Sequence, residues 1–276
     1  MRSFPSLVAF LALILGATSG RSATELPFAY KGGMVWLKVE AQGRRLNFVL
    51  DSGAGASVVD AGVARLLGLK RGATETVQGV DGNCAACRVE DFAGTIGSLS
   101  VPRGMLALDL GSVSRSCGSH IDGLIGLDFF RGRTVQIDYP ARVIRVSARG
   151  EEGAPSGECL ALKRRNDAFC VRVSMQGADP VWMRLDTGCS SAVEWVMGAA
   201  KASGGRGPSV AAGMGSAKGT RMEVRIGEQV VHEVETGLHA QAMFPGEAGL
   251  VGNGVWANFC VTLDVDGGRV WLRRGK

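Results

Sequence analysis

The sequence predicts an all-β protein built from two similar halves, and two observations support this prediction. Glycine supplies 41 of the 276 residues, about 15% against an average near 7%, while aromatic residues make up only 6%. Many turns joining short strands rich in Val, Leu and Thr would have this composition. The second observation is that four sequence features recur in the same order along the chain.

The repeat is clearest around two aspartates. The segment 48–53, FVLDSG, returns 135 residues later as 183–188, MRLDTG. Two further segments return 126 residues later: DGLIGL at 122–127 as AGLVGN at 248–253, and VQID at 135–138 as VTLD at 261–264. Before each aspartate a Gln-Gly turn separates two alternating stretches, so each aspartate is predicted to end the second strand of a β-hairpin. We interpret the chain as a duplicated lobe.

Domain boundaries follow from local composition. Residues 148–157 are rich in Gly, Pro and Glu and lack periodicity, which is typical of a linker and leaves lobes at 28–149 and 158–276. In each lobe one helix is expected after the aspartate motif, at 59–67 and at 192–202, because glycine follows each run. All other segments are predicted to be short strands.

Residues 1–27 are predicted to be a signal peptide and N-terminal leader. Arg2 precedes an apolar run from Leu7 to Ala17, and small residues follow it. This run is well short of the roughly 20 residues that span a bilayer, and no comparable run follows. We expect an exported protein, periplasmic or secreted, with no stable membrane insertion after signal cleavage. The net charge of +5 without a long basic tract predicts no nucleic-acid partner.

The cysteines indicate neither a metal centre nor a cofactor. Seven are present, so at least one thiol should stay unpaired even in an exported protein. Cys84 and Cys87 form the only C-x-x-C pair, and zinc would need a second such pair or suitably spaced histidines. We predict no metal and no cofactor. Cys84 and Cys87 are expected either to form a local disulfide or to remain two inert thiols.

The repeated aspartates are the residues with a clear chemical role. After each one, a small hydroxyl residue and Gly let backbone N–H groups turn back onto the carboxylate, which holds the acid rigidly. One such motif alone is most often an ordinary turn, but two related by a pseudo-two-fold can place Asp51 beside Asp186. Like charges about 3 Å apart cannot both ionise easily, so the pair would hold one proton and supply both an acid and a base. Asp51 and Asp186 are the predicted catalytic residues.

With these motifs the chain resembles the pepsin and retropepsin superfamily of aspartic peptidases. The signature of that superfamily is an apolar strand, Asp-[Ser/Thr]-Gly, a flap hairpin, and a strand with two apolar residues and Gly that crosses behind the aspartate loop. LIG at 124–126 completes it in the first lobe, and LVG at 250–252 completes it in the second. The first lobe looks most like exported bacterial retropepsin-like proteases, through LGL at 67–69 and GLIGLD at 123–128.

The resemblance implies two all-β acid-protease barrels related by a pseudo-two-fold, with a short helix in each lobe. It implies that four loop residues support the aspartates: Ser52, Gly53, Thr187 and Gly188. It also implies two substrate-binding flaps, with Gly79, Val80, Asp81 and Gly82 in the first and Gly213, Met214 and Gly215 in the second. Three features depart from the family pattern: GAGAS at 53–57 is unusually rich in glycine, Cys189 stands where Ala or Ser is usual, and neither flap contains Tyr.

We therefore predict an aspartic endopeptidase that hydrolyses a polypeptide substrate through a water activated between two carboxylates. Ala54 stands where the hydroxyl of a Ser could hydrogen-bond to the carboxylate and favour its ionisation. Because Ala54 lacks this hydroxyl, we predict a less acidic pH optimum, of about 4 to 6. Two alternatives stay open: a non-catalytic peptide-binding module on the same scaffold, and a homodimer whose site forms from two copies of Asp51. The complete motif at Asp186 argues against the homodimer, and we expect a monomer.

Overall fold

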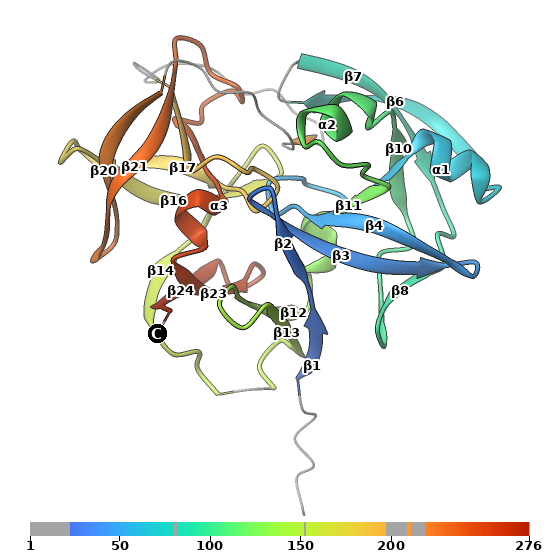
Figure 1. Ribbon diagram of the computed structural model, residues 1–276, viewed down its shortest axis with the longest axis horizontal. Coiled ribbons are helices and arrows are strands. Elements are labelled where there is room, and N and C mark those ends of the chain that lie inside the picture. The colour runs from blue at the N-terminus through green and yellow to red at the C-terminus, as the bar shows by residue number, and fades with distance from the viewer. Residues whose placement is uncertain (1–22, 80–81, 152, 197–208, 211–218, 276) are drawn as a thin grey trace, which may run out of the picture.

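The computed structural model describes residues 23–79, 82–151, 153–196, 209–210 and 219–275, and strands dominate it (Figure 1). The predicted all-β class is confirmed, and the sheets have the barrel-like arrangement that the resemblance implies. Residues 1–22 of the predicted leader lie outside the described residues. Its last four residues, 24–27, differ from the prediction, because they form a strand that pairs with residues 143–146 and belongs to the fold.

The strands of the described residues form three sheets. The first, formed mainly by the first half of the chain, contains β2 (Ala29–Lys31), β3 (Met34–Ala41), β4 (Arg44–Leu50), β5 (Val58–Asp60), β6 (Arg71–Gly79), β7 (Gly82–Val89), β8 (Gly94–Ile96), β9 (Leu99–Ser100), β10 (Met105–Leu108), β11 (Gly123–Ile125) and β19 (Ser209–Val210). The second, from the second half, contains β15 (Lys163–Arg165), β16 (Ala168–Met175), β17 (Val181–Leu185), β18 (Val193–Val196), β20 (Gly219–Ile226), β21 (Gln229–His239) and β22 (Gly249–Val251). The third combines both halves: β1 (Thr24–Pro27), β12 (Arg133–Asp138), β13 (Val143–Ala148), β14 (Glu158–Ala161), β23 (Phe259–Asp264) and β24 (Arg269–Arg274).

The two predicted hairpins, β3–β4 and β16–β17, are present and pair antiparallel. Both Gln-Gly pairs adopt the left-handed conformation: φ is 48° at Gln42 and 72° at Gly43, and 50° at Gln176 and 76° at Gly177. Glycine takes this conformation without steric cost, which suits a tight turn. Behind the hairpins, β4 runs parallel to β11 and β17 runs parallel to β22. Each aspartate strand is therefore backed by the repeated apolar segment, as the sequence predicts.

The pseudo-two-fold passes through the third sheet. There β12 pairs antiparallel with β23, and Gln136 lies opposite Thr262, its own counterpart in the repeat. The side-chain amide of Gln136 donates to the hydroxyl of Thr262 at 3.2 Å. In Figure 1 these strands lie below the two barrels and connect them. The halves are thus joined by a continuous hydrogen-bonded sheet.

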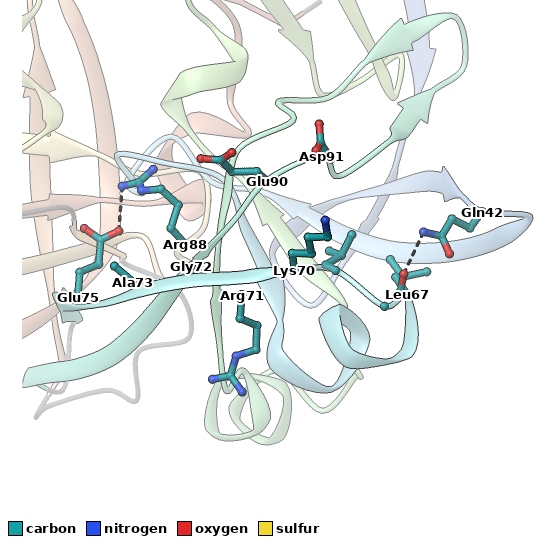
Figure 2. A pocket seen from close by; sticks show the side chains of 12 residues that line it. Gln42, Leu67, Lys70, Arg71, Gly72, Ala73, Glu75, Arg88, Glu90 and Asp91 are labelled. Carbon is teal, nitrogen blue, oxygen red and sulfur yellow. Dashed lines mark hydrogen bonds and ion pairs between the residues drawn. The ribbon is translucent and has the colours of Figure 1, made fainter.

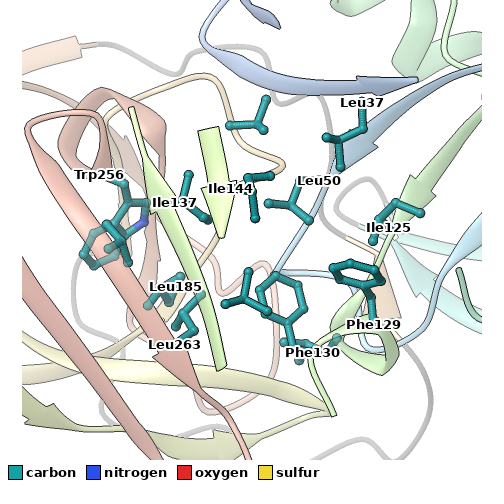
Figure 3. Close-up of a cluster of buried hydrophobic side chains, with 14 of the residues drawn as sticks. Leu37, Leu50, Ile125, Phe129, Phe130, Ile137, Ile144, Leu185, Trp256 and Leu263 are labelled. Carbon is teal, nitrogen blue, oxygen red and sulfur yellow. The ribbon is translucent and has the colours of Figure 1, made fainter. Parts of the chain in front are cut away.

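A hydrophobic core shared by the two halves fixes the ends of the aspartate strands. Figure 3 shows side chains from both halves in one cluster, among them Leu50, Ile125, Leu185 and Leu263. Leu50 and Leu185 directly precede the two aspartates, and each is at most 1% exposed. Burying a side chain of this size stabilises the fold by about 1.5 to 3 kcal/mol relative to exposing it. The backbone just before each aspartate is therefore held in place by a buried leucine.

The helices differ from the prediction in several places. The described helices are α1 (Ala61–Leu66), α2 (Gly111–Ser116), the 3-10 helix η1 (Leu127–Phe129) and α3 (Asn253–Trp256), and none of them is long and apolar enough to cross a membrane. The sequence predicts only the first. It begins later than the predicted 59–67, because β5 occupies 58–60 and the side chain of Asp60 caps the helix by accepting from the N–H groups of Gly62 and Val63.

The second predicted helix, 192–202, is wrong in its described part. Residues 193–196 form β18, a central strand that pairs parallel with β21 and antiparallel with β22. Hydrogen bonding along both edges decides the conformation of this short apolar run, which local periodicity alone could not distinguish from a helix. Residues 197–202 lie outside the described residues.

All seven cysteines are unpaired. A disulfide between Cys84 and Cys87, one of the two expected outcomes, is wrong, because both residues lie on β7 three positions apart. Side chains three positions apart on a strand point to opposite faces, and their Cα atoms are too far apart for a disulfide. Cys84 packs against the cluster of apolar side chains that contains Val77, while Cys87 contacts the side chains of Thr74 and Arg71.

Candidate active site

Two loops bring the predicted aspartates together where β4 and β17 end. Asp51 directly follows β4, and its backbone N–H donates to the carbonyl of Ile125 at 2.9 Å. Asp186 follows β17 in the same way, with its N–H donating to the carbonyl of Val251 at 3.0 Å. Both aspartates are completely buried. The bonds extend the parallel strand pairs by one residue, so the position of each carboxyl is set by the sheet.

Ser52 and Thr187 brace the two loops against each other. The N–H of Ser52 donates to the hydroxyl of Thr187 at 3.0 Å, and the N–H of Thr187 donates to the hydroxyl of Ser52 at 3.0 Å. Each hydroxyl then donates across the interface, Ser52 to the carbonyl of Leu185 and Thr187 to that of Leu50, both at 2.9 Å. Four buried bonds with pseudo-two-fold symmetry hold the loops in register, which is the supporting position that the resemblance implies for these two residues.

Backbone amides hold one oxygen of each carboxyl group. The N–H groups of Gly53 and Ala54 donate to Oδ1 of Asp51 at 2.9 and 3.0 Å, and that of Gly188 donates to Oδ1 of Asp186 at 2.8 Å. The other oxygen of each group, Oδ2, is buried and receives no hydrogen bond from any other residue that the structure describes, while the two carboxyl groups are hydrogen-bonded to each other. A buried carboxylate oxygen without a donor from the surrounding protein costs free energy, and such groups in native proteins commonly have a chemical role.

The glycines of the two motifs allow the carboxyl groups to approach. A Cβ atom built on Gly53 would lie only 2.5 Å from Cγ of Asp186, and one built on Gly188 would lie no farther from Cγ of Asp51. Each glycine therefore lies directly against the carboxyl group of the opposite loop. Any side chain at these positions would separate the two acids, so glycine is required here by close approach.

Burial raises the pKa of both carboxyl groups. The pKa of Asp51 rises to about 7, although the N–H groups of Ala54 and Gly53 and the charge of Arg184 oppose the effect of burial. Burial and the charge of Asp51 raise the pKa of Asp186 well above its usual range, while Arg184 again lowers it. Two such groups in contact titrate as one unit, and this unit retains at least one proton at neutral pH.

A polar pair that the sequence analysis omits from the site supports the first loop alone. Ser57 donates to Asp128 through its N–H at 2.9 Å and its hydroxyl at 2.6 Å, and the same hydroxyl accepts from the N–H of Gly126 at 3.0 Å. In the second half, Ala192 and Gly254 stand at the corresponding positions, and a Cβ on Gly254 would lie 2.6 Å from that of Ala192. The sequence signal for this pair is Asp128 at the end of the segment GLIGLD. The repeat did not point to Asp128, because no acidic residue stands at its position in the second half.

Arg184 is a second residue that the sequence reasoning misses. It lies on β17, two residues before Asp186, and is completely buried in contact with Glu247. The signal in the sequence is a charged residue at a strand position where the first half has Val49. A charge in a strand ordinarily indicates a solvent-facing side chain, so the pattern alone did not indicate a buried ion pair.

The predicted flap residues are described only in part. Gly79 ends β6 and Gly82 begins β7, so these two residues lie at the tip of a hairpin in the first half. Five predicted flap residues lie outside the described residues: Val80, Asp81, Gly213, Met214 and Gly215. The first flap contacts the second half of the chain, because the side chain of Gln78 donates to the carbonyl of Met243 at 3.4 Å and β19 pairs with β6.

A surface cavity of about 760 Å³ lies at the end of α1 and along β6 and β7 (Figure 2). Its lining carries charges of both signs, including Arg88 paired with Glu75 at 2.8 Å, and includes no residue of either aspartate loop. This cavity is therefore separate from the aspartate pair. Among the residues that the structure describes, no group of three or more His, Cys, Asp or Glu side chains is arranged to hold a metal ion.

Comparison with known proteins agrees with this geometry. Residues 37–129 match the family model described as aspartyl protease, a range that includes the first aspartate motif and ends just after the apolar segment behind it. The resemblance to the aspartyl proteases is thus confirmed over the first half of the chain. No curated protein is detectably similar to the chain.

Proposed function

We propose, from the match of residues 37–129 to the aspartyl proteases, that this protein is an aspartic endopeptidase whose site is completed by the second half of its chain. The observation that carries the proposal is the pair of buried carboxyl groups, which are hydrogen-bonded to each other, are each held through Oδ1 by backbone amides, and receive no other hydrogen bond at Oδ2 from the described residues. A single Asp-Ser-Gly turn would not require this arrangement. Two of them, braced by four reciprocal bonds, form a rigid acid and base.

The chemistry follows from the shared proton of the pair. The ionised carboxylate takes a proton from a water molecule as that water attacks the carbonyl carbon of the peptide bond. The protonated carboxyl group donates a hydrogen bond to the carbonyl oxygen, where negative charge develops. The amine then leaves with a proton supplied by the pair, and no covalent enzyme intermediate forms. The proton belongs to the pair and is not assigned to Asp51 or Asp186, because coupled groups titrate as one unit.

The decisive experiment is cleavage of a mixed peptide library by the purified protein, with and without a statine-type inhibitor. We expect inhibitor-sensitive cleavage in the wild type and none in Asp51→Asn or in Asp186→Asn, because each change removes half of the acid and base pair. The exposed Asp179 supplies a matched control, and Asp179→Asn should cleave like the wild type.

Other outcomes of this experiment identify the alternatives. Peptides that bind but remain intact would indicate the non-catalytic binding module. Substantial turnover by Asp186→Asn, with a rate that depends on the square of protein concentration, would indicate a homodimer that uses two copies of Asp51. Full activity of both asparagine variants would refute the proposal.

The pH dependence of cleavage gives an independent check. Activity needs one proton on the pair, so kcat/KM should be bell-shaped in pH. Burial raises the pKa of both groups, which keeps that proton in place at neutral pH and moves the range of activity above a strongly acidic optimum. A rate that rises steadily to about pH 9 would exclude the pair as the catalytic unit.

We also propose that the protein is exported to the periplasm or beyond, folds as two lobes at 24–149 and 158–276, the first of which begins with β1, and works as a monomer. The apolar run from Leu7 to Ala17 supports export. The pairing of β12 with β23 joins the two halves of one chain, which supports a site completed without a second copy. N-terminal sequencing of the protein recovered from the periplasmic fraction or medium tests the first point. Sedimentation of the purified protein tests the last.

A further inference from the structure

A buried arginine beneath the aspartate pair is the most unusual feature of the second half. Arg184 is completely buried, and its guanidinium binds Glu247 through two bonds, from Nε at 2.8 Å and from Nη2 at 2.7 Å. Its Nη1 donates at 2.8 Å to the carbonyl of Gly53, which belongs to the opposite aspartate loop. The ring of Phe244 lies against the guanidinium, with 3.4 Å between Cζ of Arg184 and the ring centroid.

Further groups pack around this guanidinium and its partner Glu247. The thiol of Cys170 faces it from β16, and Asn166 donates to the same carboxylate of Glu247 at 3.0 Å. Two further charged groups lie on this side: Arg165, which donates to the carbonyl of Gly246, and Lys163, which lies opposite Cys170 on β15. The guanidinium is therefore fixed between Glu247, a ring and the first aspartate loop. A fixed donor of this kind can set the position of the Gly53 carbonyl, and through it the loop that holds Asp51.

Stability alone does not explain this ion pair. Removing two charges from water costs several kcal/mol for each ion, and buried pairs of this kind are often no more stabilising than apolar residues of the same volume. The first half of the chain does without it, because Val49 stands at the repeat position and is fully buried. The ion pair of Arg184 with Glu247 occurs only in the half that carries Asp186, yet Arg184 contacts the loop that carries Asp51.

The charge of Arg184 acts on both carboxyl groups. It lowers the pKa of Asp51 and of Asp186, in opposition to the effect of burial on each. Burial of this degree without a nearby positive charge would keep both groups protonated, and a doubly protonated pair has no base. A positive charge fixed by Glu247 therefore favours the singly ionised state that the chemistry requires.

We propose that Arg184, held in place by Glu247, is a positioning residue for the aspartate pair: it anchors the Gly53 carbonyl across the interface and sets the pH range in which one carboxyl group is ionised. The inference rests on the proposed function only for its kinetic consequence. The anchoring and the effect on carboxyl titration are properties of the folded protein and can be measured without a substrate.

Two variants should move the titration of the pair in opposite directions. Arg184→Met/Glu247→Gln removes both charges together, so that no unpaired ion is left buried, and should raise the acidic limb of the pH profile by about 1 pH unit. Glu247→Gln alone leaves the arginine charge without compensation and should lower the same limb. Arg184→Lys keeps the charge but loses the two-point contact with Glu247, so kcat should fall while the acidic limb stays within about 0.3 pH units of the wild type.

The experiment combines kinetics with a direct observation of the acids. The kcat/KM of peptide cleavage is measured against pH, and aspartate carboxyl carbons are followed by ¹³C NMR over the same range, with the Asp51 signal assigned from Asp51→Asn. Arg172→Met, at an exposed arginine on β16, is the matched control and should leave both measurements unchanged. Near-ultraviolet circular dichroism verifies that each variant is folded.

Equal titration of the carboxyl groups in the wild type, in Glu247→Gln and in the double variant would overturn the inference. If the double variant does not fold, the downward shift in Glu247→Gln decides the question by itself. Failure of the proposed peptidase function and failure of the inference about Arg184 would give different results. A wild type that cleaves no peptide but shows the opposite carboxyl shifts refutes the proposed function and supports this inference, whereas cleavage with unchanged carboxyl titration does the reverse.

Discussion

The free energy of unfolding should depend on pH through the two buried aspartates, and Asp51→Asn/Asp186→Asn should remove that dependence. A carboxyl group whose pKa is higher in the folded state than in the unfolded state binds protons more tightly when folded. Its contribution to stability is therefore greatest at low pH and is lost as pH rises towards the folded pKa. Asparagine cannot titrate, so the double variant lacks this term.

The structure determines both the window and the size of the effect. The ordinary carboxyl pKa is about 3.9, whereas burial raises that of Asp51 to about 7 and raises that of Asp186 as well. Between about pH 5 and pH 7 the unfolded groups are ionised while the folded pair keeps at least one proton. The free energy of unfolding of the wild type should then fall by at least about 1.4 kcal/mol per pH unit relative to the double variant, or at least roughly 2.7 kcal/mol across the window.

Urea denaturation followed by tryptophan fluorescence at about pH 5, 6 and 7 measures this difference. The exposed Asp179 again supplies the control, and Asp179→Asn should follow the pH dependence of the wild type. Parallel curves for the wild type and the double variant, differing only by a constant offset, would refute the assignment of a retained proton to the pair. This outcome would hold whether or not the protein cleaves peptides.

Two further predictions concern the loops. Gly188→Ala places a Cβ against the carboxyl group of Asp51, so cleavage should fall about 100-fold or more, while Gly104→Ala, where nothing lies within 4 Å, should have no effect; equal rates for both would exclude close approach as the role of the glycine. Thr187→Val leaves a buried amide and a buried carbonyl of the first loop without a partner and should lower the free energy of unfolding by about 1 to 3 kcal/mol. Thr187→Ser keeps the hydroxyl and should retain most of that stability, and an equal loss in both would contradict the bracing role.

The sequence predicts the aspartate pair well because the residues that form it are local to two repeated segments. The strand, the acid, the hydroxyl residue and the glycine are consecutive, and the apolar segment behind each strand repeats with them. Two copies in the same order require a symmetric arrangement, and the pairing of Gln136 with Thr262 in the third sheet supplies it. The repeat does not predict features that occur in only one half of the chain.

The parts that the sequence does not predict depend on contacts between distant residues. Arg184 is buried because Glu247, 63 residues later, lies beside it, and no local pattern connects the two. The segment at 193–196 is a strand because β21 and β22 hydrogen-bond to both of its edges, whereas its composition is compatible with a helix. α3 spans only four residues, too short for a helical period to emerge from the sequence, and α2, although as long as α1, begins without the side-chain cap that Asp60 gives α1.

The bonds between the two aspartate loops have a consequence for the order in which the protein assembles. Ser52 is bonded to Leu185, and Asp186 is bonded in turn to Val251, so the site depends on residues spread over some 200 positions of the chain. Contacts of such long range form late, because the entropy of closing the intervening loops must be overcome first. A chain still being synthesised therefore carries its first acid long before the second can reach it. Until the two loops meet, the two carboxyl groups are separate, solvated side chains, and the proton shared by the buried pair has no equivalent in the incomplete chain.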